Sequence, residues 1–294
     1  MAIRPSYPIY KTQTDLPVLK PFQLAPPTFA SASHWLTSLP PYISILLFLP
    51  MLIWPFASHA AGEFTMLDAF ESLITWIPFL FASGFLFNVL ISLFSMLFGT
   101  LAGAVLGLGQ ISRIGPIRKV SWFFTQLFRN SPWLVILFIV LLAMPFEFVI
   151  FGVIVTVPDW MKAVFGLSLP IMANISEIVR GAVLSVPTAQ WEAAESLAFS
   201  RQQVLWRIIL PQCFKRMIPP WMNWYAILTM ATPLCSLLGV EEIITLSRQA
   251  MEAENNHPEL LVPFYSFALG MFFIYCYPIA RLTIRLERKY AVKL

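Results

Sequence analysis

The sequence predicts an all-α polytopic membrane protein with about six transmembrane helices. Of its 294 residues, 58% are hydrophobic and only 12% are charged, whereas soluble domains are about 45–50% apolar and about 25% charged. Apolar runs recur along the chain, and a run of about 20 residues is enough for a helix to cross a bilayer. This composition excludes a soluble enzyme and a disordered chain.

The amino-terminal part is predicted to be a cytoplasmic tail followed by an extra anchor. Residues 1–41 contain eight prolines and three basic residues, a composition typical of an irregular segment without its own core. The apolar run 42–57 ends in Ala57-Ser58-His59-Ala60, which resembles a signal-peptide cleavage site. A signal peptide is disfavoured because 41 residues are too many for its charged leader. We therefore predict an uncleaved anchor helix and an outer segment over 42–75.

Five further apolar runs are predicted to cross the membrane. The run 146–157 is too short to cross on its own, and we predict a re-entrant or interfacial segment there. Glycines recur every four residues in the second span, where a small-residue face lets another helix approach closely. Packing within the chain is favoured over a subunit contact at this face. The five predicted spans are 80–109, 122–145, 160–180, 217–238 and 261–283, and the glycines are Gly99, Gly103 and Gly107.

The placement of basic residues supports six spans with both termini in the cytoplasm. With the amino terminus inside, 17 of the 19 Lys and Arg residues fall on or near the cytoplasmic side, and only Lys162 and Arg248 do not. A basic excess in short cytoplasmic loops is the usual signature of orientation. The inner segments are then 1–41, 110–121, 181–216 and 284–294.

Two charged residues lie close together at the end of the fourth span. Glu177 and Arg180 are three residues apart and therefore share one face of a helix. A carboxylate at membrane depth indicates a functional site by default. A local ion pair near the inner interface explains the same pattern, and the sequence leaves both interpretations open.

The longest inner loop is predicted to hold two short helices. Thr188 is placed to cap the first helix, Ser200 and Gln203 form a capping box for the second, and Pro211 is predicted to end it. On the first helix Ala194 and Ala198 are predicted to share a smooth face, which would admit another protein beside the charged Glu192.

This loop resembles the EAA loop of the membrane subunits of binding-protein-dependent ABC importers. The motif is Glu-Ala-Ala, three residues, Gly, nine residues, then Ile-x-Leu-Pro, and this chain departs from it only by an alanine at the glycine position. The resemblance implies that the loop at 187–212 couples the membrane domain to a partner ATPase. The matching positions are Glu192, Ala193, Ala194, Ala198, Ile208, Leu210 and Pro211.

Three other stretches are similar to the polar amino acid subfamily of these permeases. They are Phe128–Leu134, Glu177–Ala182 and Thr232–Val240, and the resemblance covers about residues 80–290. Two departures affect the solute: Met230-Ala231 stands where members often carry charges, and Asn130 replaces a glycine. The resemblance, together with the cost of polar groups at membrane depth, indicates a candidate substrate path formed by Arg129, Asn130, Ser131, Glu177, Thr232 and Ser236.

The resemblance implies a multi-pass permease of the cell inner (plasma) membrane that catalyses no reaction itself. No Gly-x-x-x-x-Gly-Lys-Ser/Thr phosphate loop occurs, so we expect no cofactor on this chain and ATP on the partner ATPase. The implied partners are ATP-binding cassette subunits, a second permease subunit (identical or different), an extracytoplasmic solute-binding protein and membrane lipid. Cys213, Cys235 and Cys276 show no metal spacing, and no metal site is predicted.

Three alternatives are disfavoured. A secondary transporter driven by an ion gradient would not need the EAA motif. A membrane enzyme would need a catalytic pattern that His34, His59 and His257 do not provide. A DNA-reading helix-turn-helix at 189–210 would need a supporting soluble domain, which cannot fit between two membrane spans, so no nucleic acid partner is expected.

Overall fold

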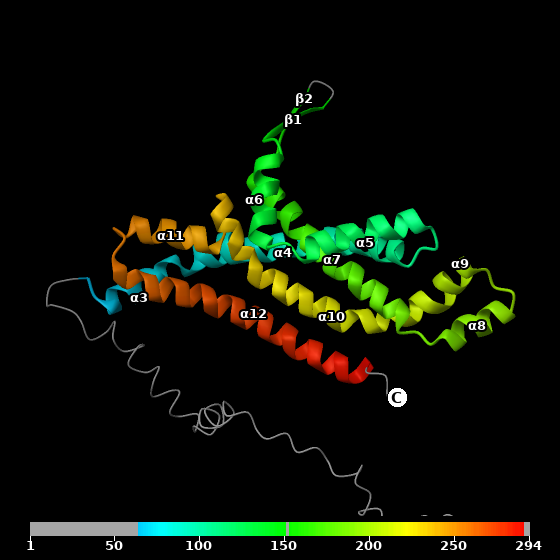
Figure 1. Cartoon of the computed structure of the whole chain (residues 1–294). Helices are drawn as coiled ribbons and strands as arrows, with labels where there is room; N and C mark the ends of the chain where they lie inside the picture. The colour runs from blue at the N-terminus through cyan, green and yellow to red at the C-terminus, as the bar shows by residue number, and fades with distance from the viewer. Residues whose placement is uncertain (1–63, 151–152, 291–294) are drawn as a thin grey trace, which may run out of the picture. The chain divides into compact units, whose positions relative to one another are not determined.

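The computed structural model describes residues 64–150 and 153–290. The predicted tail 1–41 and the first predicted span 42–57 lie outside the described residues. The chain divides by contacts into residues 1–60 and 61–294, and the fold described here is that of the second unit. It is a helical bundle with one small hairpin, which confirms the all-α class (Figure 1).

A single long helix opens the described part. It consists of α3 (Met66–Phe79), a wider π-helical segment η3 (Leu80–Phe85) and α4 (Leu86–Gln110). Thr65 begins it with a capping box, in which Thr65 N donates to Asp68 at 2.8 Å and Asp68 N donates to Thr65 Oγ1 at 3.3 Å. The wide segment follows Pro78, which has no backbone N–H to donate to the preceding turn. The expected boundary near residue 80 therefore falls inside one helix.

The predicted span 122–145 is not one straight helix. It comprises the end of α5 (Gly115–Arg129) and α6 (Trp133–Ala143), which meet at a bend of 106°. Pro132 is extended, with φ −61° and ψ 130°, and a proline also disfavours helical backbone at the residue before it. The helix therefore breaks over Asn130–Pro132.

The described residues of the segment 146–157 form a β-hairpin rather than a helix, and the re-entrant or interfacial placement of this segment stays a prediction. Strand β1 (Glu147–Ile150) pairs antiparallel with β2 (Val153–Thr156), with Glu147 opposite Thr156. Its sequence is rich in Val, Ile and Phe, which favour strands over helices. The hairpin continues from α6 away from the long helices (Figure 1).

The remaining chain is helical to its last described residue. Helix α7 packs along α4, and α10 packs along α12. The elements are α7 (Asp159–Leu184), α8 (Thr188–Ser196), α9 (Arg201–Gln203), η4 (Val204–Ile209), α10 (Leu210–Ala231), η5 (Thr232–Leu238), α11 (Ile243–Ala253), η6 (Pro258–Leu260) and α12 (Leu261–Tyr290).

The glycine face of α4 packs against α7 within the chain, as predicted. A Cβ atom on Gly99 would lie 2.5 Å from Ile171 Cγ2, and one on Gly103 or Gly107 would lie 2.7 Å from a carbonyl oxygen of α7. Such distances are shorter than side-chain carbons tolerate, so only glycine permits this separation of the two helices.

The number of membrane spans is only partly tested by the described residues. Three helices are long and apolar enough to cross: Met66–Gln110, Asp159–Leu184 and Pro258–Tyr290. Two bent pairs raise the number to five if each pair counts as one span. The sixth predicted span, 42–57, is not described, so the count of six stays a prediction.

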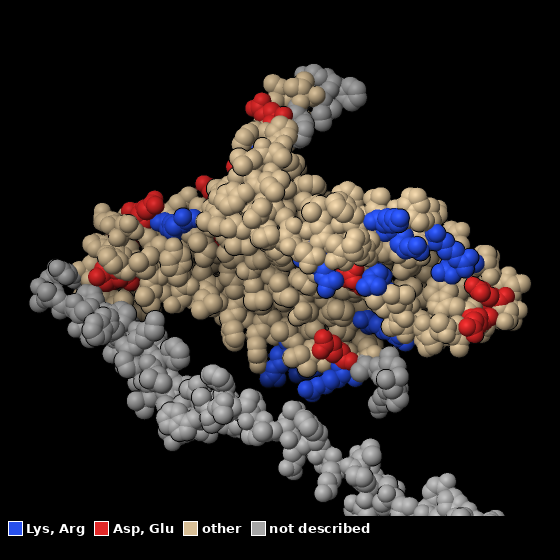
Figure 2. Space-filling view, viewed as in Figure 1, with Lys and Arg blue, Asp and Glu red and all other residues tan. Residues whose placement is uncertain are grey.

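The two ends of the bundle differ in charge. Helices α3 and α11 lie at one end, the α11 end, and α8 and α9 lie at the other, the α8 end (Figure 1). Most basic side chains visible in Figure 2 gather toward the α8 end. This segregation agrees with the charge pattern that the sequence showed.

Candidate functional site

The loop at the α8 end has the two predicted helices, with one predicted cap confirmed and one wrong. Ser200 and Gln203 form the capping box: Ser200 N donates to Gln203 Oε1 at 2.9 Å and Gln203 N donates to Ser200 Oγ at 3.4 Å. Thr188 does not cap α8, because it is the first helical residue and Pro187 precedes it without a side-chain bond.

Pro211 does not end the second helix, which is a further correction. The chain runs without interruption from α9 through the π-helical segment η4 and into α10, where Pro211 lies in the first turn. The missing N–H of proline is tolerated at a helix start, and a π segment alters the hydrogen-bond ladder next to it. The loop therefore continues directly into α10.

The alanines of the EAA motif do not share one outward face. Ala194 is only 4% exposed and packs in a cluster with Val183, Val204 and Ile209. Ile208 and Leu210 pack against the same cluster. Glu192, Ala193 and Ala198 are exposed, and so is Leu197. The outward surface of α8 is therefore charged and apolar rather than smooth.

Ala198 occupies the position where the EAA motif has glycine. Its φ of 59° is in the left-handed region, which alanine adopts at a cost and glycine adopts freely. The turn is closed by Phe199 N, which donates to Ala194 O at 3.3 Å. The left-handed backbone explains why a glycine suits this position.

Glu177 lies between two arginines. Arg180 Nη2 is 2.7 Å from Glu177 Oε2, and Arg129 Nη1 is 3.6 Å from the same oxygen. The structure thus brings together two predicted path residues, Arg129 and Glu177, and it confirms the local ion pair. The carboxylate side chain is only 15% exposed.

Asn130 and Ser131, in contrast, bond to their own helix. Asn130 Nδ2 donates to Gln126 O at 2.8 Å and Ser131 Oγ donates to Leu127 O at 2.6 Å. Ser131 satisfies the Leu127 carbonyl near the end of α5, and Asn130 adds its side chain to a carbonyl that its own backbone N also contacts, at 3.2 Å. Their first role is to end the helix at the bend before α6.

A second polar cluster, largely missed by the sequence analysis, surrounds Thr232. Asn88 Nδ2 donates to Thr232 Oγ1 at 2.9 Å and to Glu242 Oε2 at 3.0 Å, and Ile243 N donates to Asn88 Oδ1 at 3.1 Å. Asn88, Thr232 and Glu242 are all fully buried. The sequence placed Glu242 in an outer loop; the lone amide of Asn88 in an apolar run was the available signal. Ser236 bonds to Pro233 O at 2.8 Å instead.

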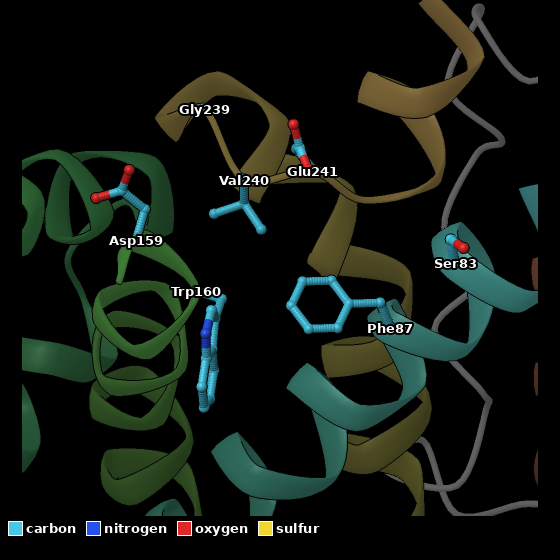
Figure 3. A pocket seen from close by; sticks show the side chains of 7 residues that line it. All are labelled: Ser83, Phe87, Asp159, Trp160, Gly239, Val240 and Glu241. Atoms are coloured by element: carbon cyan, nitrogen blue, oxygen red, sulfur yellow. The ribbon is translucent and has the colours of Figure 1, made fainter. Parts of the chain in front are cut away.

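A pocket opens beside this cluster at the α11 end. It has a volume of about 380 Å³, and the rings of Phe87 and Trp160 face it from opposite sides (Figure 3). Two carboxylates, Asp159 and Glu241, also line it. Lys162 is fully buried nearby, with Nζ 3.4 Å from Asp159 Oδ1 and 3.2 Å from the centre of the Phe146 ring. We call this cavity the Trp160 pocket.

The family follows from a match that spans most of the described chain. Residues 95–286 match the family described as binding-protein-dependent transport system inner membrane component. The chain belongs to this family. It is therefore a membrane permease subunit of the ABC importer class, as the EAA motif at 192–211 had indicated.

Curated relatives and solved structures agree with this assignment. The L-cystine transport system permease protein of Bacillus subtilis (strain 168) is 30% identical over 208 residues, covering 71% of this chain and 85% of the relative. The arginine transport system permease protein of the same organism is 30% identical and covers 66% and 85%. A crystal structure of an amino acid ABC transporter with histidines is similar in fold, with a TM-score of 0.63 at 23% identity over 75% of this chain and 98% of the other.

Proposed function

We propose that this permease imports polar amino acids or related small solutes, and that separate ATPase subunits drive it. The observation that carries the solute class is the match to relatives whose names specify L-cystine and arginine transport. The expected assembly contains ATP-binding cassette subunits, a second permease subunit and an extracytoplasmic solute-binding protein. The permease lies in the inner membrane with both termini in the cytoplasm.

The coupling proposal assigns two roles within the EAA loop. Three exposed residues contact the ATPase, namely Glu192 and Ala193 of α8 and Leu197, which directly follows that helix. A second set keeps the loop in shape, either by packing beneath α8 or by shaping the turn and the helix that follow it: Ala194, Ala198, Ile208, Leu210 and Pro211. Closure of the ATPase then moves the loop as a rigid body and changes the access of the path.

The solute path is proposed to include the two polar clusters. Arg129 and Glu177 supply charges toward the α8 end, and Arg129, whose side chain is 46% exposed, is free enough to pair with a solute carboxylate. Thr232 and Ser236 belong to the segment beside the Trp160 pocket, and Asn130 and Ser131 shape the bend of α5 and α6.

Reconstitution of the complete transporter tests the solute class and the energy source together. Proteoliposomes that contain the permease, its ATPase and its solute-binding protein should accumulate labelled polar amino acids only when ATP is enclosed with the ATPase. Uptake that proceeds without the ATPase and follows an imposed ion gradient would instead establish a secondary transporter. ATP-driven uptake of sugars or metal ions, with no amino acid competing, would refute the solute class.

A further inference from the structure

A cleft at the α8 end lies between the EAA loop and the membrane helices. Its volume is about 480 Å³. The ends of α4 and α7 and the start of α5 form one side, and α8 and α9 form the other. Three arginines from three different helices line it, namely Arg118 of α5, Arg180 of α7 and Arg201 of α9. We call it the arginine cleft.

The arginine cleft has a positive excess that the described residues do not neutralise. Glu192 is the one acidic residue among those that line it. Arg180 already pairs with Glu177 at 2.7 Å, whereas Arg118 and Arg201 have no acidic side chain within 4.0 Å in residues 64–150 and 153–290. Like charges gathered in a cleft focus a positive potential, which attracts an anion.

The side chains in the cleft are held ready for such a ligand. The guanidinium of Arg201 lies 5.2 Å from the centre of the Trp191 ring, a contact that limits its freedom. Gln110 also lines the cleft, but its amide nitrogen already donates to Thr125 and Ser176 at 3.0 and 3.1 Å. The charged donors left for a ligand are guanidinium groups, whose planar N–H pairs match the oxygens of a phosphate. The Thr188 hydroxyl and the Trp191 indole N–H belong to further residues that line the cleft.

The surroundings of Arg118 indicate how a phosphate could arrive. Its neighbours on α5, Ile117 and Val120, are exposed and apolar, so the helix presents an apolar surface next to a charged one. A phospholipid could lay its chains along this surface and its headgroup in the cleft. A free phosphate could reach the same arginines from the cytoplasm.

We propose that the arginine cleft binds a phosphate-bearing anion that ties the EAA loop to the membrane helices. Arg201 belongs to the helix that continues into α10, and Arg118 and Arg180 belong to helices that pack on each other. A ligand held by all three favours one arrangement of loop and bundle. By linkage it shifts the equilibrium of any step that moves the loop, and so the fraction of transporters ready for ATP hydrolysis. This inference does not depend on which solute is carried.

The test uses the assembled transporter in lipid nanodiscs. ATP hydrolysis stimulated by the loaded solute-binding protein is measured while phosphatidylglycerol replaces phosphatidylcholine, at constant ionic strength. A second arm adds inorganic phosphate to nanodiscs of phosphatidylcholine alone. A response to the first titration identifies a lipid headgroup, and a response to the second identifies a small anion. A flat rate in both arms overturns the proposal.

Matched variants separate the cleft from general surface charge. Arg118→Gln should shift the half-effective amount of the responding anion by at least about tenfold, because a charged hydrogen bond to the anion is lost. Lys119→Gln removes the same charge from the next position of α5, which does not line the cleft, and should leave the response unchanged. Arg118→Lys keeps the charge and should lose only part of the response to the anion. Equal shifts in Arg118→Gln and Lys119→Gln, or no shift in Arg118→Gln, refute the site.

Discussion

At the scale of single residues, the backbone of Ala198 places a strained residue in the EAA turn. An L-amino acid in the left-handed region costs about 1–2 kcal/mol, and the strain sits between α8 and α9, where the loop reverses direction. Glycine would adopt the same φ of 59° without that cost. The turn is therefore less stable with Ala198 than it would be with the glycine of the EAA motif.

Ala198→Gly should stabilise the protein by about 1 kcal/mol, since relief of the strain exceeds the extra entropy that glycine loses on folding. Thermal unfolding of the purified permease measures the change. Ala193→Gly is the matched control: Ala193 is an exposed helical residue of α8, and its replacement should destabilise by about 0.5–1 kcal/mol. Destabilisation by both substitutions would contradict the claim that the backbone of Ala198 is strained.

Substitution of Arg129 distinguishes between two roles of this residue, a contact with the solute and a structural ion pair. Under the path proposal, Arg129→Gln should raise the solute concentration that gives half-maximal transport by about tenfold, because a charged hydrogen bond to the solute is lost. Arg113→Gln, in the loop before α5, should not. If Arg129→Gln lowers only the amount of protein, and what remains transports with unchanged solute dependence, Arg129 serves structure alone.

At the scale of elements, α8 separates an outward surface from an inward one. A tryptophan at Ala193 should block ATPase docking, because this side chain is exposed on the proposed contact surface. Solute-stimulated ATP hydrolysis should be lost while unfolding of the permease is unchanged. A tryptophan at Ala194 should destabilise the permease itself, because that position is buried against α7 and η4. Normal stimulation in Ala193→Trp would remove this surface from the docking proposal.

The packing of α4 on α7 depends on its glycines. Gly103→Leu places a Cβ 2.7 Å from Met172 O and 2.8 Å from Ile175 Cβ, so the helices must separate. Such overpacking costs about 1–3 kcal/mol. Gly270→Leu in α12 is the control, since a Cβ there meets nothing within 4 Å. Size-exclusion profiles and melting temperatures in detergent should change for Gly103→Leu only.

The helices were predictable from the sequence because a membrane crossing requires a long apolar run. Their bends were not, because Pro132 within an apolar run is compatible with either a kinked span or a sharp turn, and packing on α7 decides between them. The pair of Asn88 and Glu242 was equally hidden, since 154 residues separate the two and no local pattern joins them. Ala194 looked like a docking residue because the motif does not show on which side of α8 its near neighbours in the sequence, Val183 and Val204, pack.

At the scale of the whole molecule, the charge difference between the two ends predicts the orientation. A reporter fused after Phe199, in the turn between α8 and α9, should report the cytoplasm. One fused after Asn255, between α11 and α12, should report the outside. We expect this orientation because loops rich in Lys and Arg stay on the cytoplasmic side of the membrane. The same reporter signal at both sites would contradict the proposed topology.

The uninterrupted helical course from Arg201 to Leu238 limits how this chain can change in length. Each residue added to an α-helix turns everything beyond it by about 100°. One insertion within α10 would rotate Thr232 away from Asn88 while the EAA loop stayed in place. The wide turn η4 is the segment best able to absorb an extra residue. Substitutions in α10 change single side chains, whereas an insertion or a deletion there changes the direction of every side chain beyond it. The length of α10 is therefore more tightly constrained than its sequence.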